Sequence, residues 1–352
     1  MEFEVSQSSW RALQREGHVR VPNPLTQTEF TRLKTGVDDL LRKYPHGFVH
    51  SPPYSGTMPQ PRTSAPTAND FTPTVIIPHA GFLEPRILEP LSNPNLHDFL
   101  ERILGKNFYL SHTWFQKVPP GTGRLSFHKD RRGSINFNIL VDDVDEKMGS
   151  TCLIPGSHNN TPPVEYYMND PRRQHPNEVD MTGKAGDMVF FSSEAWHARS
   201  QNNSKHSTRR LFYNFFSRSS RDTTAWNGVV SDAQLAAAKA VIPSEYHHMF
   251  SVNQQEAQRL ATVQGSRLKR WALESQNSGE FFRDLAYSSL VCGRSANNDH
   301  HDGYLRPYTS RLVEETRFSA LRFFLHVRPV PTLKVVAKKL LQRKAAPKSM
   351  AE

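Results

Sequence analysis

The stretch Leu125-Ser126-Phe127-His128-Lys129-Asp130 places a histidine and an aspartate two residues apart. In a β-strand, the side chains at positions i and i+2 point to the same face of the sheet. The imidazole and the carboxylate would then converge and leave room for a third ligand. Two histidines and one carboxylate form the facial triad of non-haem Fe(II) sites, which keeps coordination positions open. The stretch therefore predicts two of the three ligands of an iron ion.

The third ligand is expected on a later strand that folds back beside the first. His197 is the best candidate, because it follows the apolar segment 188–191, which a Gly-Asp turn opens. A neutral imidazole is a good ligand for Fe(II). We therefore predict that His128, Asp130 and His197 bind the metal and are the catalytic residues.

Two arginines, Arg209 and Arg210, open the strand predicted over 208–216. An arginine beside a metal is suited to bidentate pairing with a carboxylate. A cofactor that chelates iron at one end and carries a carboxylate at the other would use both features, and 2-oxoglutarate is such a molecule. We predict Arg209 as its anchor, with Arg210 as the second choice. Gln116, Asn136 and Asn138 are polar residues on predicted strands that could point into the barrel and contact cofactor or substrate, with Gln116 and Asn138 assigned to the cofactor.

The middle of the chain consists of short alternating segments separated by turn residues, which is typical of an all-β sandwich or barrel. Strands are predicted over 18–22, 108–118, 134–141, 150–154, 188–191 and 208–216. Two Pro-rich polar segments, 50–78 and 159–182, are predicted as long loops. Loops of this length are usually functional or disordered. The first could be a lid over an active site or a simple surface excursion.

Helical patterns flank this mainly β core. Before it, helices are predicted over 8–17 and 93–104, and a capping box from Thr26 to Glu29 begins a third helix. Beyond Ser219 helices are predicted over 231–241, 253–274, 279–290, 310–325 and 334–343. We therefore expect a β domain with N-terminal helices over 1–225 and a helical C-terminal extension over 226–352.

Composition limits the class of protein. The chain has 352 residues, of which 37% are hydrophobic, and it contains two cysteines, Cys152 and Cys292. Two cysteines in a chain of this length predict neither a disulfide scaffold nor a zinc site, which fits a reducing compartment. No run of about 18 apolar residues is present, and the first residues do not resemble a signal peptide. We expect a cytoplasmic protein.

The positive charge of the chain is concentrated in its last part. The formal net charge is +10, and residues 317–352 carry nine basic residues and one acidic residue, or +8. The amphipathic helix predicted over 334–343 could contact an anionic membrane surface. The alternative, which we favour, is that this helix packs its apolar face on the core and leaves its lysines in solvent. No motif supports nucleic-acid binding. The Asp299-His300-His301-Asp302 cluster is predicted to be an exposed polar loop, and a metal site there is the second alternative.

Five motifs in order resemble the phytanoyl-CoA dioxygenase family of Fe(II)- and 2-oxoglutarate-dependent oxygenases. They are the entry segment 17–22, His128-x-Asp130, the acidic turn 142–145, the Gly149–His158 block with its Pro-Gly-Ser-His end, and the closing segment from Gly186 through His197 and Asn202 to Arg209. Together they span about 17–217 of the chain.

This resemblance implies a double-stranded β-helix, which is a cupin-like jelly roll of two packed sheets, with iron at its mouth. It also implies that O₂ and 2-oxoglutarate are consumed, that succinate and CO₂ are released, and that a small-molecule or carrier-tethered substrate is hydroxylated. Arg199 departs from the family, which often has a small hydroxyl residue there, and Asn138 aligns where some members carry a Trp. Related halogenases lack the carboxylate ligand, so Asp130 indicates hydroxylation. The alternatives are a catalytically silent binding or scaffold protein and a membrane-associated oxygenase acting on a lipid-like substrate.

Overall fold

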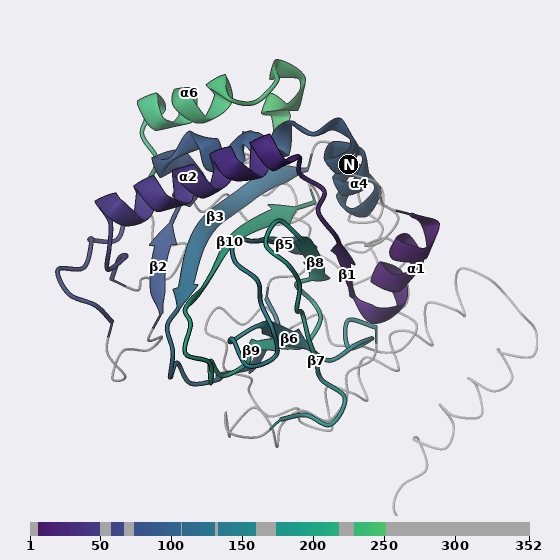
Figure 1. Cartoon of the computed structure of the whole chain (residues 1–352). Coiled ribbons are helices and arrows are strands. Elements are labelled where there is room, and N and C mark those ends of the chain that lie inside the picture. Colours follow the sequence, from purple (N-terminus) through teal and green to yellow (C-terminus); the bar gives the residue numbers. More distant parts are fainter. Residues whose placement is uncertain are drawn as a thin grey trace, which may run out of the picture.

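The computed structural model describes residues 6–49, 58–66, 74–106, 108–130, 133–159, 174–217 and 229–250. Its centre is a pair of antiparallel sheets, and helices lie against the outer face of the larger sheet (Figure 1). The space between the sheets is lined by the inward side chains of both. The candidate functional residues lie in and around this space. A residue can therefore contact a bound ligand only if its side chain is on the inner face of its strand.

The larger sheet has six strands in the order β1-β8-β5-β10-β3-β2. The longest strands, β3 and β10, run side by side, and β10 also pairs with β5. The bounds are β1 (His18–Val21), β2 (Val75–Pro78), β3 (Tyr109–Val118), β5 (Ser134–Leu140), β8 (Met188–Ser192) and β10 (Thr208–Phe216).

The smaller sheet has four short strands in the order β4-β9-β6-β7. They are β4 (Leu125–His128), β6 (Thr151–Leu153), β7 (Val179–Asp180) and β9 (His197–Arg199). Leu153 from this sheet packs with Leu140, Val189 and Phe191 from the larger one, which closes the two sheets on each other. This is the predicted double-stranded β-helix, and the fold class is confirmed.

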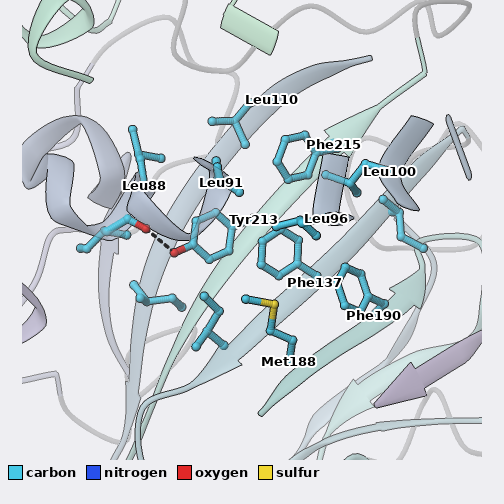
Figure 2. Packing of buried hydrophobic residues seen from close by; sticks show 14 of the residues in the cluster. Leu88, Leu91, Leu96, Leu100, Leu110, Phe137, Met188, Phe190, Tyr213 and Phe215 are labelled. Carbon is cyan, nitrogen blue, oxygen red and sulfur yellow. Dashed lines mark hydrogen bonds between the residues drawn. The ribbon is translucent and has the colours of Figure 1, made fainter. Parts of the chain in front are cut away.

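The outer face of the larger sheet is covered by helices and holds the main hydrophobic core (Figure 2). Leu211, Tyr213 and Phe215 alternate along β10 and point into this core. The Tyr213 hydroxyl donates a hydrogen bond to the carbonyl oxygen of Ile87 at 2.5 Å. The helices are α1 (Gln7–Glu16), α2 (Gln27–Lys43), α3 (Ala80–Leu83), α4 (Pro94–Leu104) and α6 (Asp232–Ala240), with 3₁₀ helices η1 (Pro85–Ser92) and η2 (Ser244–Phe250).

Local sequence signals explain where these helices begin and end. The Thr26 side chain accepts a hydrogen bond from the Glu29 amide and the Glu29 side chain returns one to Thr26, which is the predicted capping box. Gly17 ends α1 with a left-handed backbone, φ 81°, which other residues adopt at a cost. His18 then enters β1 at once, so α1 is held next to β8 through the pairing of β1.

Two strands lie inside segments predicted as loops. β2 falls within 50–78 because Val75 and Ile77 alternate into the core, and as an edge strand it tolerates Pro78. β7 falls within 159–182 and pairs with β6. Residues 50–57, 67–73 and 160–173 of these two predicted loops lie outside the described residues. So do the helices predicted over 253–274, 279–290, 310–325 and 334–343.

After residue 217 the described chain resumes at 229 and contains α6, within the predicted helix over 231–241, followed by η2. Ile242 and Phe250 are buried in the same core cluster as the N-terminal helices, so residues 229–250 pack directly on the first part of the chain. The division of the chain at residue 225 stays a prediction. Among the described residues, no helix is both long and apolar enough to cross a membrane.

Candidate metal centre

The three predicted metal ligands come together at the end of the smaller sheet. His128 ends β4, His197 begins the neighbouring strand β9, and the two are direct cross-strand partners. The Nε2 atom of His197 lies 3.3 Å from one carboxylate oxygen of Asp130, and the Nε2 atom of His128 lies 3.9 Å from the other. The three possible ligand atoms lie within 4.8 Å of one another. This spacing suits one metal ion bound by three protein side chains.

The His197 ring is oriented by its other nitrogen. Its Nδ1–H donates a hydrogen bond to the carbonyl oxygen of Ala195 at 2.9 Å, and the Phe191 ring packs 5.0 Å away. With the proton assigned to Nδ1, the lone pair of Nε2 faces Asp130 and is available to a metal. A second hydrogen bond that fixes the tautomer of a ligand is a common feature of histidine metal sites.

Asp130 lies beyond the last residue of β4 and is held by contacts with other strands. Its backbone N–H donates to the carbonyl oxygen of Ser193 at 2.9 Å. Its carboxylate accepts a hydrogen bond from the Asn136 side-chain amide at 3.1 Å. The same amide donates to the Ser193 hydroxyl at 3.0 Å, and the Asn136 carbonyl accepts from the Asn214 amide at 2.7 Å. A hydrogen-bond network from Asn214 on β10 through Asn136 on β5 therefore positions the Asp130 carboxylate.

The charges of the site keep the candidate ligand anionic. Burial alone would raise the pKa of Asp130, but the His197 and His128 imidazoles and the Asn136 amide hold it well below its usual range. Conversely, although burial lowers the pKa of His197, the Asp130 carboxylate more than offsets this and raises it. Asp130 is thus ionised at any pH near neutrality, as a metal ligand must be.

The structure separates the two arginines that the sequence placed side by side. Arg209 lies on the helix-facing side of β10, where it forms a bidentate ion pair with Asp142 at 2.7 and 2.9 Å. It also contacts Asp38 of α2 at 2.7 Å. The residue predicted first as the cofactor anchor is therefore on the wrong face and already has two carboxylate partners. Arg210, the second choice from the sequence, is the arginine of the pair on the inner face and remains the candidate anchor.

Arg210 points into the space between the sheets. Only 1% of its surface is exposed. It donates to the Thr151 hydroxyl at 3.0 Å and to the carbonyl oxygen of Gly149. Its Nε atom is buried and has no hydrogen-bond partner in the described part of the chain. No described acidic side chain forms an ion pair with it. Burial, and then the charge of Arg199, lower the pKa of Arg210 to about 9, so it stays protonated near neutral pH.

The other predicted contacts lie on the same inner face. Gln116 is the cross-strand partner of Arg210 and is partly exposed. Asn138, two residues from Asn136 on β5, is 1% exposed, and its side-chain oxygen has no hydrogen-bond partner. Arg199 is 5% exposed and also faces inward. Polar groups that are buried without partners are rare in folded proteins, so they mark a place where a ligand could bind.

Sequence reasoning missed the roles of Asn136, Ser193 and Asn214. The alternation of 134–140 carried a signal, because Ile135, Phe137 and Ile139 alternate with two asparagines, which places both asparagines on the face opposite the apolar core. The signal did not show which asparagine contacts Asp130, since that depends on how β5 and β10 are placed relative to β4.

Comparison with solved structures finds several proteins of similar fold at low sequence identity. The carbocyclase SnoK from nogalamycin biosynthesis is 16% identical, with a TM-score of 0.47, and the match covers 61% of this chain and 85% of that one. EctD from S. alaskensis with bound Fe is 18% identical, with a TM-score of 0.48 and coverage of 61% and 78%. HygX from Streptomyces hygroscopicus with nickel and 2-oxoglutarate bound is 10% identical, with a TM-score of 0.47 and coverage of 61% and 88%.

No curated protein sequence gives a significant match to this chain. Residues 13–211, which are more than half of the chain, match the model of the family described as phytanoyl-CoA dioxygenase. This range contains the smaller sheet, the larger sheet except for the end of β10, the three candidate ligands, and both Arg209 and Arg210. The chain therefore belongs to the phytanoyl-CoA dioxygenase family of Fe(II)- and 2-oxoglutarate-dependent oxygenases.

Proposed function

We propose that this protein is a dioxygenase that hydroxylates an aliphatic carbon of a small-molecule or carrier-bound substrate, with Fe(II) and 2-oxoglutarate bound between its two sheets. One observation carries the proposal: a His-Asp-His cluster and a buried arginine without a carboxylate partner lie on the same inner face. Iron bound by two imidazoles and one carboxylate keeps positions open for a bidentate ligand and O₂.

The residues present fit both groups. His128, Asp130 and His197 are the donor set that Fe(II) prefers in such sites, and their ligand atoms lie within 4.8 Å of one another. Arg210 supplies a buried guanidinium whose Nε has no partner, which suits the far carboxylate of 2-oxoglutarate. Gln116 and Asn138 are proposed to contact the co-substrate from the neighbouring strands.

When bound, iron and 2-oxoglutarate supply the oxidising chemistry, in which O₂ is consumed and succinate and CO₂ are released. The chain supplies the positions. Asn136 orients the Asp130 carboxylate, the Ala195 carbonyl orients the His197 ring, and Arg210 fixes the far end of the co-substrate. Because residue 130 is an aspartate that can supply the carboxylate ligand, hydroxylation is favoured over halogenation.

Two other readings remain to be tested by experiment. A catalytically silent jelly roll that serves as a scaffold is disfavoured by the intact ligand cluster and by the unpaired arginine. A membrane-associated oxygenase acting on a lipid-like substrate would need the basic tail, which lies outside the described residues. Co-sedimentation of full-length and 1–330 proteins with anionic liposomes tests this reading, and equal partitioning would remove the tail from it.

The decisive experiment is an anaerobic titration of the full-length protein with Fe(II) and 2-oxoglutarate, followed by the metal-to-ligand charge-transfer band. We expect the band in the wild type and its loss in His128→Ala. Arg210→Gln should weaken 2-oxoglutarate binding by roughly 100-fold, since one buried charge-assisted contact is lost. Arg209→Gln, a matched change at the adjacent position, should keep the wild-type affinity.

Absence of the band in the wild type would refute the proposal. If Arg209→Gln lost as much affinity as Arg210→Gln, the assignment of the anchor would be wrong although the reaction class could stand. Once binding is established, a screen for succinate release over substrate classes, with His128→Ala as the blank, would identify the substrate.

A further inference from the structure

A second buried arginine lies on the strand that carries His197. Arg199 is two residues further along β9, so its side chain shares the inner face with the candidate ligand. One of its terminal nitrogens donates to the carbonyl oxygen of Gly123 at 2.7 Å. Its Nε and its other terminal nitrogen are buried and have no hydrogen-bond partner among the described residues. Most of the donor capacity of this guanidinium is therefore unused.

Arg199 and Arg210 approach the same residue from opposite sheets. Arg199 is the cross-strand partner of Thr151, and Arg210 donates to the Thr151 hydroxyl at 3.0 Å. The two guanidinium groups are close enough for their charges to act on each other. Three guanidinium nitrogens, two from Arg199 and one from Arg210, are thus buried here without a described hydrogen-bond partner.

Two buried like charges without a counter-charge are unfavourable unless something else binds there. Neither guanidinium forms an ion pair with a described acidic residue. Arg124 provides the contrast within the same part of the molecule. It is also largely buried, but Glu178 pairs with it bidentately at 2.6 and 2.9 Å. Among the described residues, a carboxylate therefore pairs with one buried arginine and none pairs with the other two, which makes them candidates for binding an anionic ligand.

We propose that Arg199 and Arg210 together bind the distal carboxylate of 2-oxoglutarate, one from each sheet. The inference rests on the proposed function and adds Arg199 as a second anchor. A carboxylate has two oxygens with about four acceptor positions, which can accommodate the three unpaired donors. The position on β9 supports the assignment, because two residues of strand place the Cα atoms of Arg199 and His197 about 7 Å apart. A ligand that reaches the metal site can therefore extend toward Arg199.

The proposal predicts strong discrimination between 2-oxo acids. A 2-oxo acid without the distal carboxylate would leave both guanidinium groups unpaired, and a site with unpaired buried polar groups rejects such analogues strongly. 2-Oxopentanoate is the matched probe, because it has the same chain length and a methyl group in place of the distal carboxylate.

The test is calorimetric titration of the full-length protein, loaded with Mn(II) under anaerobic conditions, with 2-oxoglutarate and with 2-oxopentanoate. We expect Arg199→Gln to weaken 2-oxoglutarate binding at least tenfold and to leave 2-oxopentanoate binding within about threefold of the wild type. Arg210→Gln should behave in the same way. Arg199→Lys, which keeps the charge without the planar fork, should fall between Arg199→Gln and the wild type.

Several outcomes would overturn the inference. If Arg210→Gln weakens 2-oxoglutarate binding and Arg199→Gln does not, Arg199 is no anchor, while the proposed function stands. An equal loss for both acids in Arg199→Gln would indicate a general disturbance of the site and would also reject it. If neither arginine matters and the wild type does not distinguish the two acids, the proposed function fails as well. Should Arg199→Gln not fold, Arg199→Lys decides, because unchanged affinity for 2-oxoglutarate rejects the shared anchor.

Discussion

The Asn136 side chain is predicted to be the residue that holds Asp130 ready for a metal. Its amide donates to the Asp130 carboxylate at 3.1 Å and to the Ser193 hydroxyl at 3.0 Å, and its carbonyl accepts from Asn214 at 2.7 Å. Asn136→Ala removes all three contacts at once. Asn138→Ala is the matched control, because Asn138 is equally buried on the same face of β5 and its side-chain oxygen has no partner.

The magnitude follows from the contacts that are lost. A hydrogen bond to a charged group contributes about 1.5–3 kcal/mol, and a buried donor left unpaired costs about 1–3 kcal/mol. Asn136→Ala should therefore lower the free energy of unfolding of the metal-free protein by roughly 3–5 kcal/mol. Asn138→Ala removes the same atoms without an equivalent network and should lower it by about 1 kcal/mol. Denaturant unfolding of both variants measures the difference.

The second readout is metal affinity in the absence of 2-oxoglutarate, so that contacts with the co-substrate do not contribute. Loss of a group that orients a metal ligand lowers metal affinity by about 10- to 100-fold. We expect a loss of this size for Asn136→Ala in anaerobic Mn(II) titrations, and a change of less than about threefold for Asn138→Ala. Equal losses of metal affinity in the two variants would refute the positioning role, whatever their stabilities.

Two further predictions concern stability. Gly17→Ala should lower the free energy of unfolding by roughly 2–4 kcal/mol, because φ is 81° there and a Cβ would lie 2.5 Å from the His158 ring. Gly121→Ala is the control: φ is 76°, a Cβ would have nothing within 4 Å, and the loss should be about 1 kcal/mol. Equal losses in thermal unfolding would disprove the role of the His158 contact. Burial lowers the pKa of His79 and of His97 to about 4, whereas in the unfolded chain each pKa is near 6.5, so the unfolded chain binds more protons between these values. The free energy of unfolding should therefore be highest above pH 6.5 and fall as the pH drops toward 4, by up to roughly 3 kcal/mol for each histidine. His79→Asn, which tolerates the same left-handed backbone (φ 53°), should remove about half of this dependence in unfolding measured between pH 7 and 5, and an unchanged slope would contradict it.

The features that depend on short sequence distances were predictable. The capping box at Thr26, the cap at Gly17 and the convergence of His128 with Asp130 each involve residues within a few positions of one another. The order of the motifs then identified the jelly roll and His197 as the third candidate ligand. Each of these features requires only a local backbone conformation or a known order of motifs along the chain. None of them depends on which distant side chains meet across the sheets.

The choice between Arg209 and Arg210 shows where a local signal was present but was not used. Arg209 has the same parity along β10 as Leu211 and Phe215, which pack against the helices, whereas Arg210 has the parity of Asn214. The alternation alone therefore places Arg210 toward the metal ligands. The presence of Asp38 and Asp142 beside Arg209 reinforces this, but those contacts span 171 and 67 residues and follow only from the fold.

Unpaired charge is different, because no local pattern encodes it. No sequence pattern distinguishes Arg124 from Arg199 and Arg210, and in the structure all three are largely buried. Their difference lies in a partner: Glu178 reaches Arg124 across 54 residues, while no described carboxylate reaches the other two. A missing partner can be recognised only when every neighbour has been placed. Because no described carboxylate neutralises Arg199 or Arg210, we propose that these buried cations bind an anion.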